Sequence, residues 1–251
     1  MEELYLDADG VRLHAKLERP EGLERSDLCI LLHGVTGHME ERHIRAVAAA
    51  MLSVGVAVLR VELFGHGKSD GRFSDHTILT WVDEVLVVID YAKSLPWVER
   101  LVCAGHSQGG YTTMLVAGLR PHDLAALVLL SPAIVIEDGA RAGRLFRMTF
   151  DPDHLPDLVR RVPDLGEERA FGADYFRVAQ TLHVDEAIGR YGGPVLLVHG
   201  DQDATVPVRY SVDAAAAYAD ARLVVVAGDD HGYHAHLDQV TRAVADFLRA
   251  L

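Results

Sequence analysis

The chain has 251 residues, of which 49% are hydrophobic and 24% are charged, a composition typical of folded globular proteins that excludes a disordered or fibrous chain. Its formal net charge of −13 argues against binding to nucleic acid or to anionic membrane surfaces, because both would repel it at long range. The expected partner is a neutral small molecule.

In chain order, the first predicted element is a β-hairpin over residues 3–18, where hydrophobicity alternates around Asp9-Gly10. Beyond it, short apolar runs alternate with segments of helical periodicity. The apolar runs lie at 28–32, 56–61, 100–104, 124–130, 194–198 and 222–227, and the helical segments at 41–53, 78–94, 108–119, 207–219 and 237–250. This alternation predicts an α/β fold in which helices cover both faces of a mostly parallel central sheet.

One long segment interrupts this rhythm, because no clear sheet strand occurs between residues 130 and 194. It contains several phenylalanines and tyrosines and is apolar enough to fold over a ligand. We therefore expect residues 132–189 to form an inserted lid. Residues 1–131 and 190–251 are then the first and second parts of a single core domain.

The strongest motif is Gly-His-Ser-Gln-Gly-Gly at residues 105–110, directly after an apolar run and directly before a helical segment. Glycines on both sides of Ser107 permit the sharp strand-to-helix turn called a nucleophile elbow, which is typical of the α/β-hydrolase fold. The helix that follows directs its free N–H groups and positive dipole end at the reaction centre. Ser107 is therefore the predicted nucleophile.

An activated serine needs an acid and a histidine, and in this fold they follow the serine in that order, each after a later strand. Two carboxylates, Asp201 and Asp203, follow the apolar run at 194–198. We expect Asp203 to be the catalytic acid. Asp201 lies closer to the strand and is expected to accept backbone N–H groups in the turn.

Three histidines follow the last apolar run, at His231, His234 and His236. His231 is the predicted base because it lies in the loop itself, whereas the other two fall where the last helix should begin and are expected to cap that helix or to face water. The spacing His-x-x-His-x-His provides no helical i, i+4 pair between its first two members, which argues against a metal site. The predicted chemistry requires no metal and no cofactor.

The oxyanion formed during acyl transfer is usually bound by two backbone N–H groups. One belongs to the residue after the nucleophile, which is Gln108. The other comes from the loop after an early strand, and Val35, in the sequence His33 to His38, is the candidate there. A simple glycine-rich turn is the alternative interpretation of that loop.

Taken together, these motifs resemble a family. Residues 33–44, 64–71, 105–110 and 199–207 are similar to those of bacterial cinnamoyl (feruloyl) esterases, and the likeness runs nearly end to end. The resemblance implies a triad of Ser107, Asp203 and His231, an oxyanion hole formed by the Val35 and Gln108 amides, and a lid that helps to hold an aromatic acyl group.

The chain departs from this family at two places. Position 35 is Val where relatives typically carry Phe, which enlarges the space beside the acyl carbon, and both tryptophans lie outside the lid. Candidate substrate contacts within the lid are the aromatic residues Phe146, Phe150 and Tyr175. Asp138, near the start of the lid, either bonds a phenolic hydroxyl or faces solvent.

The sequence thus predicts a serine carboxylic ester hydrolase that acts through an acyl-enzyme, with hydroxycinnamoyl esters as its substrates. Two alternatives stay open. The same residues could serve a generalist short-acyl carboxylesterase, thioesterase or acyltransferase, or the scaffold could be a silent ligand-binding protein, since fold does not fix function.

The remaining patterns concern location and assembly. Acidic residues follow Met1 where a secretory signal peptide carries basic ones, and the longest uncharged run, 124–136, is too short to span a bilayer. Cys29 and Cys103 lie in apolar runs and are expected to be reduced core residues. We therefore expect a cytoplasmic protein that does not bind membranes, and the sequence leaves open whether it forms a homodimer.

Overall fold

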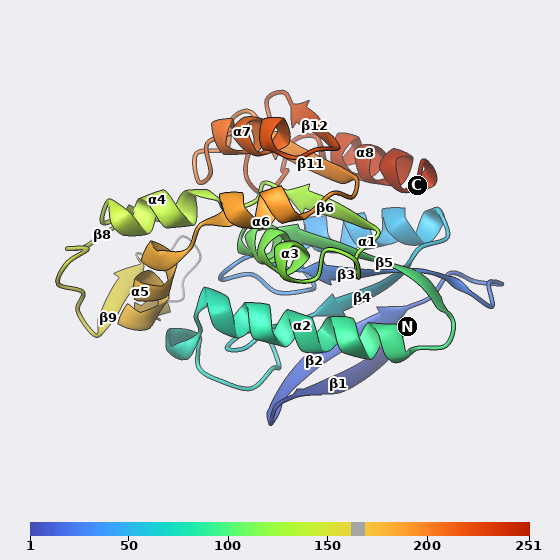
Figure 1. Cartoon of the computed structure of the whole chain (residues 1–251), viewed down its shortest axis with the longest axis horizontal. Coiled ribbons are helices and arrows are strands. Elements are labelled where there is room, and N and C mark those ends of the chain that lie inside the picture. Colours follow the sequence, from blue (N-terminus) through green and yellow to red (C-terminus); the bar gives the residue numbers. More distant parts are fainter. Residues whose placement is uncertain (162–168) are drawn as a thin grey trace.

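The computed structural model describes residues 1–161 and 169–251. Its central sheet has eight strands: β1 (Glu2–Ala8), β2 (Val11–Glu18), β3 (Ser26–Leu32), β4 (Ala57–Val61), β5 (Val98–His106), β6 (Ala126–Leu130), β11 (Val195–Gly200) and β12 (Ala221–Val226). They are arranged in the order β1-β2-β4-β3-β5-β6-β11-β12 (Figure 1). The pairs from β4 to β12 are parallel, while β1–β2 and β2–β4 are antiparallel. This is the mostly parallel sheet that the sequence predicted.

The opening hairpin is confirmed by the pairing of β1 with β2, in which Ala8 lies opposite Val11. Asp9 and Gly10 form its two-residue turn with φ values of 51° and 90°. Positive φ at both central positions matches the right-handed twist of the flanking strands. The hairpin adds two antiparallel strands to one edge of the parallel sheet.

Five helices cover the two faces of this sheet (Figure 1): α1 (Arg42–Ser53), α2 (Ile78–Ser94), α3 (Gln108–Leu119), α7 (Arg209–Ala217) and α8 (Leu237–Arg249). Side chains of α2, α3 and α7 share one apolar core, and those of α1 and α8 share the other. Alternate residues of β3 enter the two cores, since Ile30 belongs to the first and Leu31 to the second. The architecture is the predicted α/β-hydrolase fold.

The segment between β6 and β11 supplies no strand to the central sheet in the part that the structure describes. It contains α4 (Val135–Arg141), β7 (Arg144–Leu145), β8 (Met148–Thr149), β9 (Leu158–Arg161), β10 (Arg169–Gly172), α5 (Ala173–Thr181) and α6 (Val184–Arg190). Two small ribbons, β7–β8 and β9–β10, were not predicted. Residues 162–168 of the expected lid lie outside the described residues.

The end of this insertion packs on the core. Gly118 of α3 lies so close to α6 that a Cβ atom added there would be 2.6 Å from Ala187. The absence of a side chain at Gly118 therefore allows the two helices to approach. The part of the insertion that reaches outward consists of α4, α5 and the two ribbons (Figure 1).

Both cysteine side chains are buried free thiols. Burial raises the pKa of Cys103 to about 12, so this thiol is un-ionised at neutral pH. Among the described residues, no helix is both long enough and apolar enough to cross a bilayer.

Candidate active site

The turn between β5 and α3 carries Ser107 in a strained conformation, with φ 54° and ψ −120°. A non-glycine residue adopts such angles only where the surroundings enforce them. Here neighbouring backbone atoms lie so close to Gly105 and Gly109 that neither position can accommodate a Cβ atom. A Cβ atom at Gly105 would lie 2.2 Å from the carbonyl carbon of Gly109, and one at Gly109 would lie 2.4 Å from the His33 carbonyl oxygen.

Backbone hydrogen bonds hold Ser107 in this position. Its N–H donates to the Leu130 carbonyl at the end of β6 (2.9 Å), and its carbonyl accepts from the N–H groups of Tyr111 (3.0 Å) and Ala133 (2.9 Å). The residue is 4% exposed, and it lines a cavity of ≈ 710 Å³. A serine held in this way has little freedom to move away from the cavity.

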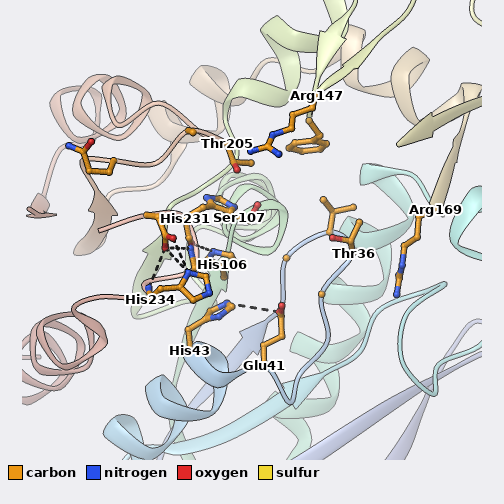
Figure 2. Close-up of a pocket in the computed structure, with 18 residues that line it drawn as sticks. Thr36, Glu41, His43, His106, Ser107, Arg147, Arg169, Thr205, His231 and His234 are labelled. Carbon is orange, nitrogen blue, oxygen red and sulfur yellow. Dashed lines mark hydrogen bonds and ion pairs between the residues drawn. The ribbon is translucent and has the colours of Figure 1, made fainter. Parts of the chain in front are cut away.

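The predicted acid and base meet across two loops. Asp203 follows β11, His231 follows β12, and His231 Nδ1 lies 2.6 Å from Asp203 Oδ2. His231 and Ser107 both line the cavity (Figure 2). No hydrogen bond joins the Ser107 hydroxyl to His231 within the described residues, and such bonds often form only when substrate is bound.

Asp203 is held as a carboxylate. Its Oδ1 accepts the N–H groups of Thr205 and Val206, each at 2.8 Å, while Oδ2 faces His231 and also His199, whose Nε2 is 3.2 Å away. Burial alone would raise the pKa of Asp203, but the hydrogen bonds from His199 and His231 outweigh it and hold this pKa well below its usual value. The negative charge is therefore kept beside the imidazole of His231.

The competing residues have other partners. Asp201 accepts the Gly228 N–H at 2.7 Å, which is the turn role expected from the sequence. His234 is exposed and lies 2.9 Å from the carboxylate of Asp230, and His236 is the residue that precedes α8, without a capping bond from its side chain. Of the predicted acids and bases, the structure brings only Asp203 and His231 together.

The loop with the first predicted oxyanion donor lies directly against the elbow. A Cβ atom at Gly34 would be 3.1 Å from the Cβ of Ser107, and Val35, the next residue, lines the cavity beside Ser107. Gln108 begins α3, and the first N–H groups of a helix have no partner within it. Both predicted N–H donors thus belong to segments that adjoin the serine.

Of the four predicted substrate contacts, the structure places only Phe146 at the cavity. Tyr175 is wholly buried and donates its hydroxyl to Gln108 Oε1 at 2.7 Å. It therefore holds the side chain of the residue after Ser107 and does not face the cavity. Phe150 packs on Phe176, with ring centroids 4.3 Å apart. Asp138 accepts the hydroxyl of Tyr210 at 2.9 Å, because helix α7 lies beside the start of the insertion.

Several residues at the site were missed in the sequence. The imidazole of His106 donates from Nε2 to the His231 carbonyl at 2.8 Å, and burial lowers the pKa of His106 well below its usual value, so the ring is neutral. Tyr233 donates its hydroxyl to the Val198 carbonyl and lies 2.8 Å from the Ser131 hydroxyl. These contacts join distant segments, and the only sequence signal was the location of His106 inside the elbow motif.

The cavity also contains charges that the overall composition did not suggest. Arg147 and Arg169 from the insertion line it, as does Glu41 from the loop before α1 (Figure 2). Burial raises the pKa of Glu41. The net charge of the whole chain is therefore a poor guide to the charge of this cavity, whose lining includes two cationic side chains of the insertion.

Comparisons with known proteins relate this chain to serine hydrolases. The family model for serine aminopeptidase, S33, matches residues 24–160, and the model for TAP-like protein matches residues 174–251. Lipase LipV of Mycobacterium tuberculosis is 31% identical over 195 residues, which are 74% of this chain and 68% of LipV. Monoacylglycerol lipase of Mycolicibacterium smegmatis is 26% identical over 92% of this chain and 89% of its own.

A similar solved structure is that of Est1E from Butyrivibrio proteoclasticus with ferulic acid bound. It is 46% identical to this chain, with a TM-score of 0.93, and the match covers 98% of this chain and 97% of Est1E. A match of this extent includes the insertion as well as the core. The chain therefore belongs to the serine hydrolase family described by the serine aminopeptidase S33 model, on the α/β-hydrolase fold.

Proposed function

We propose that this protein is a serine esterase that hydrolyses hydroxycinnamoyl esters, such as feruloyl esters, through an acyl-enzyme on Ser107. The observation that carries the proposal is the end-to-end match to Est1E, which was solved with ferulic acid bound. The cavity beside Ser107 supports it, because ≈ 710 Å³ is within the usual range for small-molecule sites. Phe146 offers an apolar wall there for an aromatic ring.

In this mechanism the Ser107 hydroxyl oxygen bonds to the ester carbonyl carbon while its proton passes to His231 Nε2. Asp203, 2.6 Å from Nδ1, fixes the imidazole and stabilises its protonated form. The Val35 and Gln108 N–H groups bind the oxyanion. His231 then gives its proton to the leaving alcohol as the ester bond breaks. In the second half of the reaction, water attacks the acyl carbon and gives a proton to His231. The acid is released when His231 returns that proton to the Ser107 oxygen.

A substrate panel tests the acyl preference. Methyl ferulate, methyl butyrate and longer alkyl esters should be compared by kcat/KM with the same leaving alcohol. We expect the aromatic ester to be preferred by roughly threefold to tenfold, since aromatic contacts add about 0.5–1.5 kcal/mol beyond area burial. A hundredfold preference for butyrate would refute the hydroxycinnamoyl assignment and favour the generalist short-acyl esterase.

The mechanism is tested at the three predicted catalytic residues. Ser107→Ala should abolish labelling by a fluorophosphonate and lower turnover by roughly 10³-fold or more. His231→Ala should be similarly inactive, whereas His234→Ala is the matched control, because His234 is an exposed neighbour paired with Asp230. A wild-type protein that binds ferulate but is neither labelled nor active would instead be a silent ligand-binding protein.

A further inference from the structure

A second histidine, His199, contacts the carboxylate of Asp203 at the same oxygen that faces His231. His199 lies on β11 and is wholly buried. Its Nε2 is 2.8 Å from the Val206 carbonyl and 3.2 Å from Asp203 Oδ2, and its Nδ1 is 2.7 Å from the Ser211 hydroxyl of α7. The ring is thus fixed at both nitrogens.

These partners determine where the proton lies. Nε2 lies beside two oxygen acceptors, so it must carry hydrogen, while Nδ1 pairs with the Ser211 hydroxyl, which can either donate or accept. The Nε2–H of His199 therefore donates to the Val206 carbonyl at 2.8 Å, and the same nitrogen lies 3.2 Å from Asp203 Oδ2, where its partial positive charge stabilises the carboxylate. This Oδ2 is the same oxygen that accepts from His231 Nδ1.

We propose that His199 is a positioning residue for the reaction, which acts through Asp203 by drawing negative charge from the oxygen that binds His231. This inference rests on the proposed function of the site. Part of the negative charge on Oδ2 is already stabilised by the nearby His199 nitrogen, so this oxygen stabilises a second positive group less strongly. His199 would thereby prevent Asp203 from over-stabilising protonated His231, which must release its proton at neutral pH to act as a base.

Removing His199 should leave Asp203 in place, because the Thr205 and Val206 N–H groups still hold Oδ1 at 2.8 Å. Its Oδ2 would then bind His231 more strongly and favour the protonated imidazole. The activity would consequently need a higher pH to develop. A purely structural role for His199 predicts lower stability without such a shift.

Other titratable groups surround the pair and stay the same in each variant. Those that face His231 or Asp203, or line the same cavity, are Glu41, His43, His106, Arg147, Arg169, Asp230, Tyr233 and His234. Because none of them is altered, a change in pH dependence can be assigned to His199.

The test compares His199→Leu, which removes both ring nitrogens, with His199→Gln, whose side-chain amide can still donate from about the place of Nε2. His14→Leu is the matched control, since His14 is also a buried imidazole on a carboxylate, 2.7 Å from Glu62, but lies on β2 away from the cavity. For each folded variant, kcat/KM for methyl ferulate and the rate of fluorophosphonate labelling of Ser107 are measured from pH 5 to 9.

We expect the acid limb of both profiles to move to higher pH in His199→Leu, by about half a pH unit or more, and to move less in His199→Gln. The limb should not move in His14→Leu. An unmoved limb, or one that moves to lower pH, in His199→Leu would overturn the proposal. If that variant does not fold, His199→Phe, which keeps a ring in the same place without either nitrogen, must shift the limb in the same direction, and no shift there is equally decisive.

Two readouts separate this inference from the proposed function. If wild-type protein is labelled at Ser107 but does not hydrolyse methyl ferulate, the substrate assignment fails while the labelling profile still tests His199. If the ester is hydrolysed and the acid limb is insensitive to His199, only the role of His199 fails.

Discussion

The loop that carries His231 depends on one buried hydroxyl, and removing it is a sharp test of the structure. Tyr233, two residues after His231, is wholly buried and has φ 56°. Its hydroxyl donates to the Val198 carbonyl at 2.8 Å, so at the other contact the Ser131 hydroxyl must donate to it, also at 2.8 Å. One side chain thus links the histidine loop to β11 and to the residue that follows β6.

In the hydrogen bond between the Ser131 and Tyr233 hydroxyls, removing the acceptor should cost more stability than removing the donor. In Tyr233→Phe the buried Ser131 hydroxyl loses its acceptor, and an unsatisfied buried group costs about 1–3 kcal/mol. The Val198 carbonyl keeps the N–H of Ser131. In Ser131→Ala the tyrosine keeps its own acceptor and only one ordinary hydrogen bond is lost, worth about 1 kcal/mol. The tyrosine variant should therefore be the less stable one.

Thermal unfolding and steady-state kinetics measure the difference. For a chain of 251 residues, a loss of about 2 kcal/mol lowers Tm by roughly 4–8 °C, and a loss of about 1 kcal/mol lowers it by roughly 2–4 °C. We also expect kcat for methyl ferulate to fall in Tyr233→Phe with little change in KM, because the loop of His231 is loosened. Equal Tm values for wild type and Tyr233→Phe would refute this account of the loop.

Further predictions concern buried charges and glycines. Burial raises the pKa of Glu84 to about 8. The folded protein therefore loses stability as pH rises from about 4.5 to 8. Glu84→Gln should have a higher urea midpoint than the wild type at pH 9 but not at pH 5. Burial lowers the pKa of His33 and His76 to about 4, so Tm should fall as pH drops from about 6.5 to 4, and a flat profile would contradict this. Gly109→Ala should unfold or inactivate the protein because its Cβ would lie 2.4 Å from the His33 carbonyl oxygen, whereas Gly189→Ala, which meets nothing within 4 Å, should raise Tm slightly.

The structure also reveals how the insertion supports the site in a way that composition did not predict. Its aromatic residues were expected to surround the substrate. Tyr175 and Phe176 instead pack with Phe171, with which their ring centroids lie 4.8 and 6.0 Å apart. The insertion thus uses most of these rings for its own small core and contributes Phe146, Arg147 and Arg169 to the lining of the cavity.

The sequence by itself determined the features that depend on local patterns, which are the core strands and helices, the elbow and the candidate acid and base. Hydrophobic periodicity identified the strands and helices of the core. The glycines around Ser107 predicted the elbow, because only a residue without a Cβ atom fits at those positions. The order of serine, acid and histidine limited the candidates to two aspartates and three histidines, and their places in the loops favoured Asp203 and His231. Such features depend on neighbours in the chain and on a known fold, so they can be predicted without coordinates.

Only the tertiary structure decided which side chains meet across the ends of the strands. His199 and Ser131 resemble ordinary buried polar residues in the sequence, yet one contacts Asp203 and the other Tyr233. The two arginines of the cavity come from either side of residues 162–168 and could not be placed from spacing. Their surroundings arise from packing between segments far apart in the chain, and periodicity carries no information about such contacts.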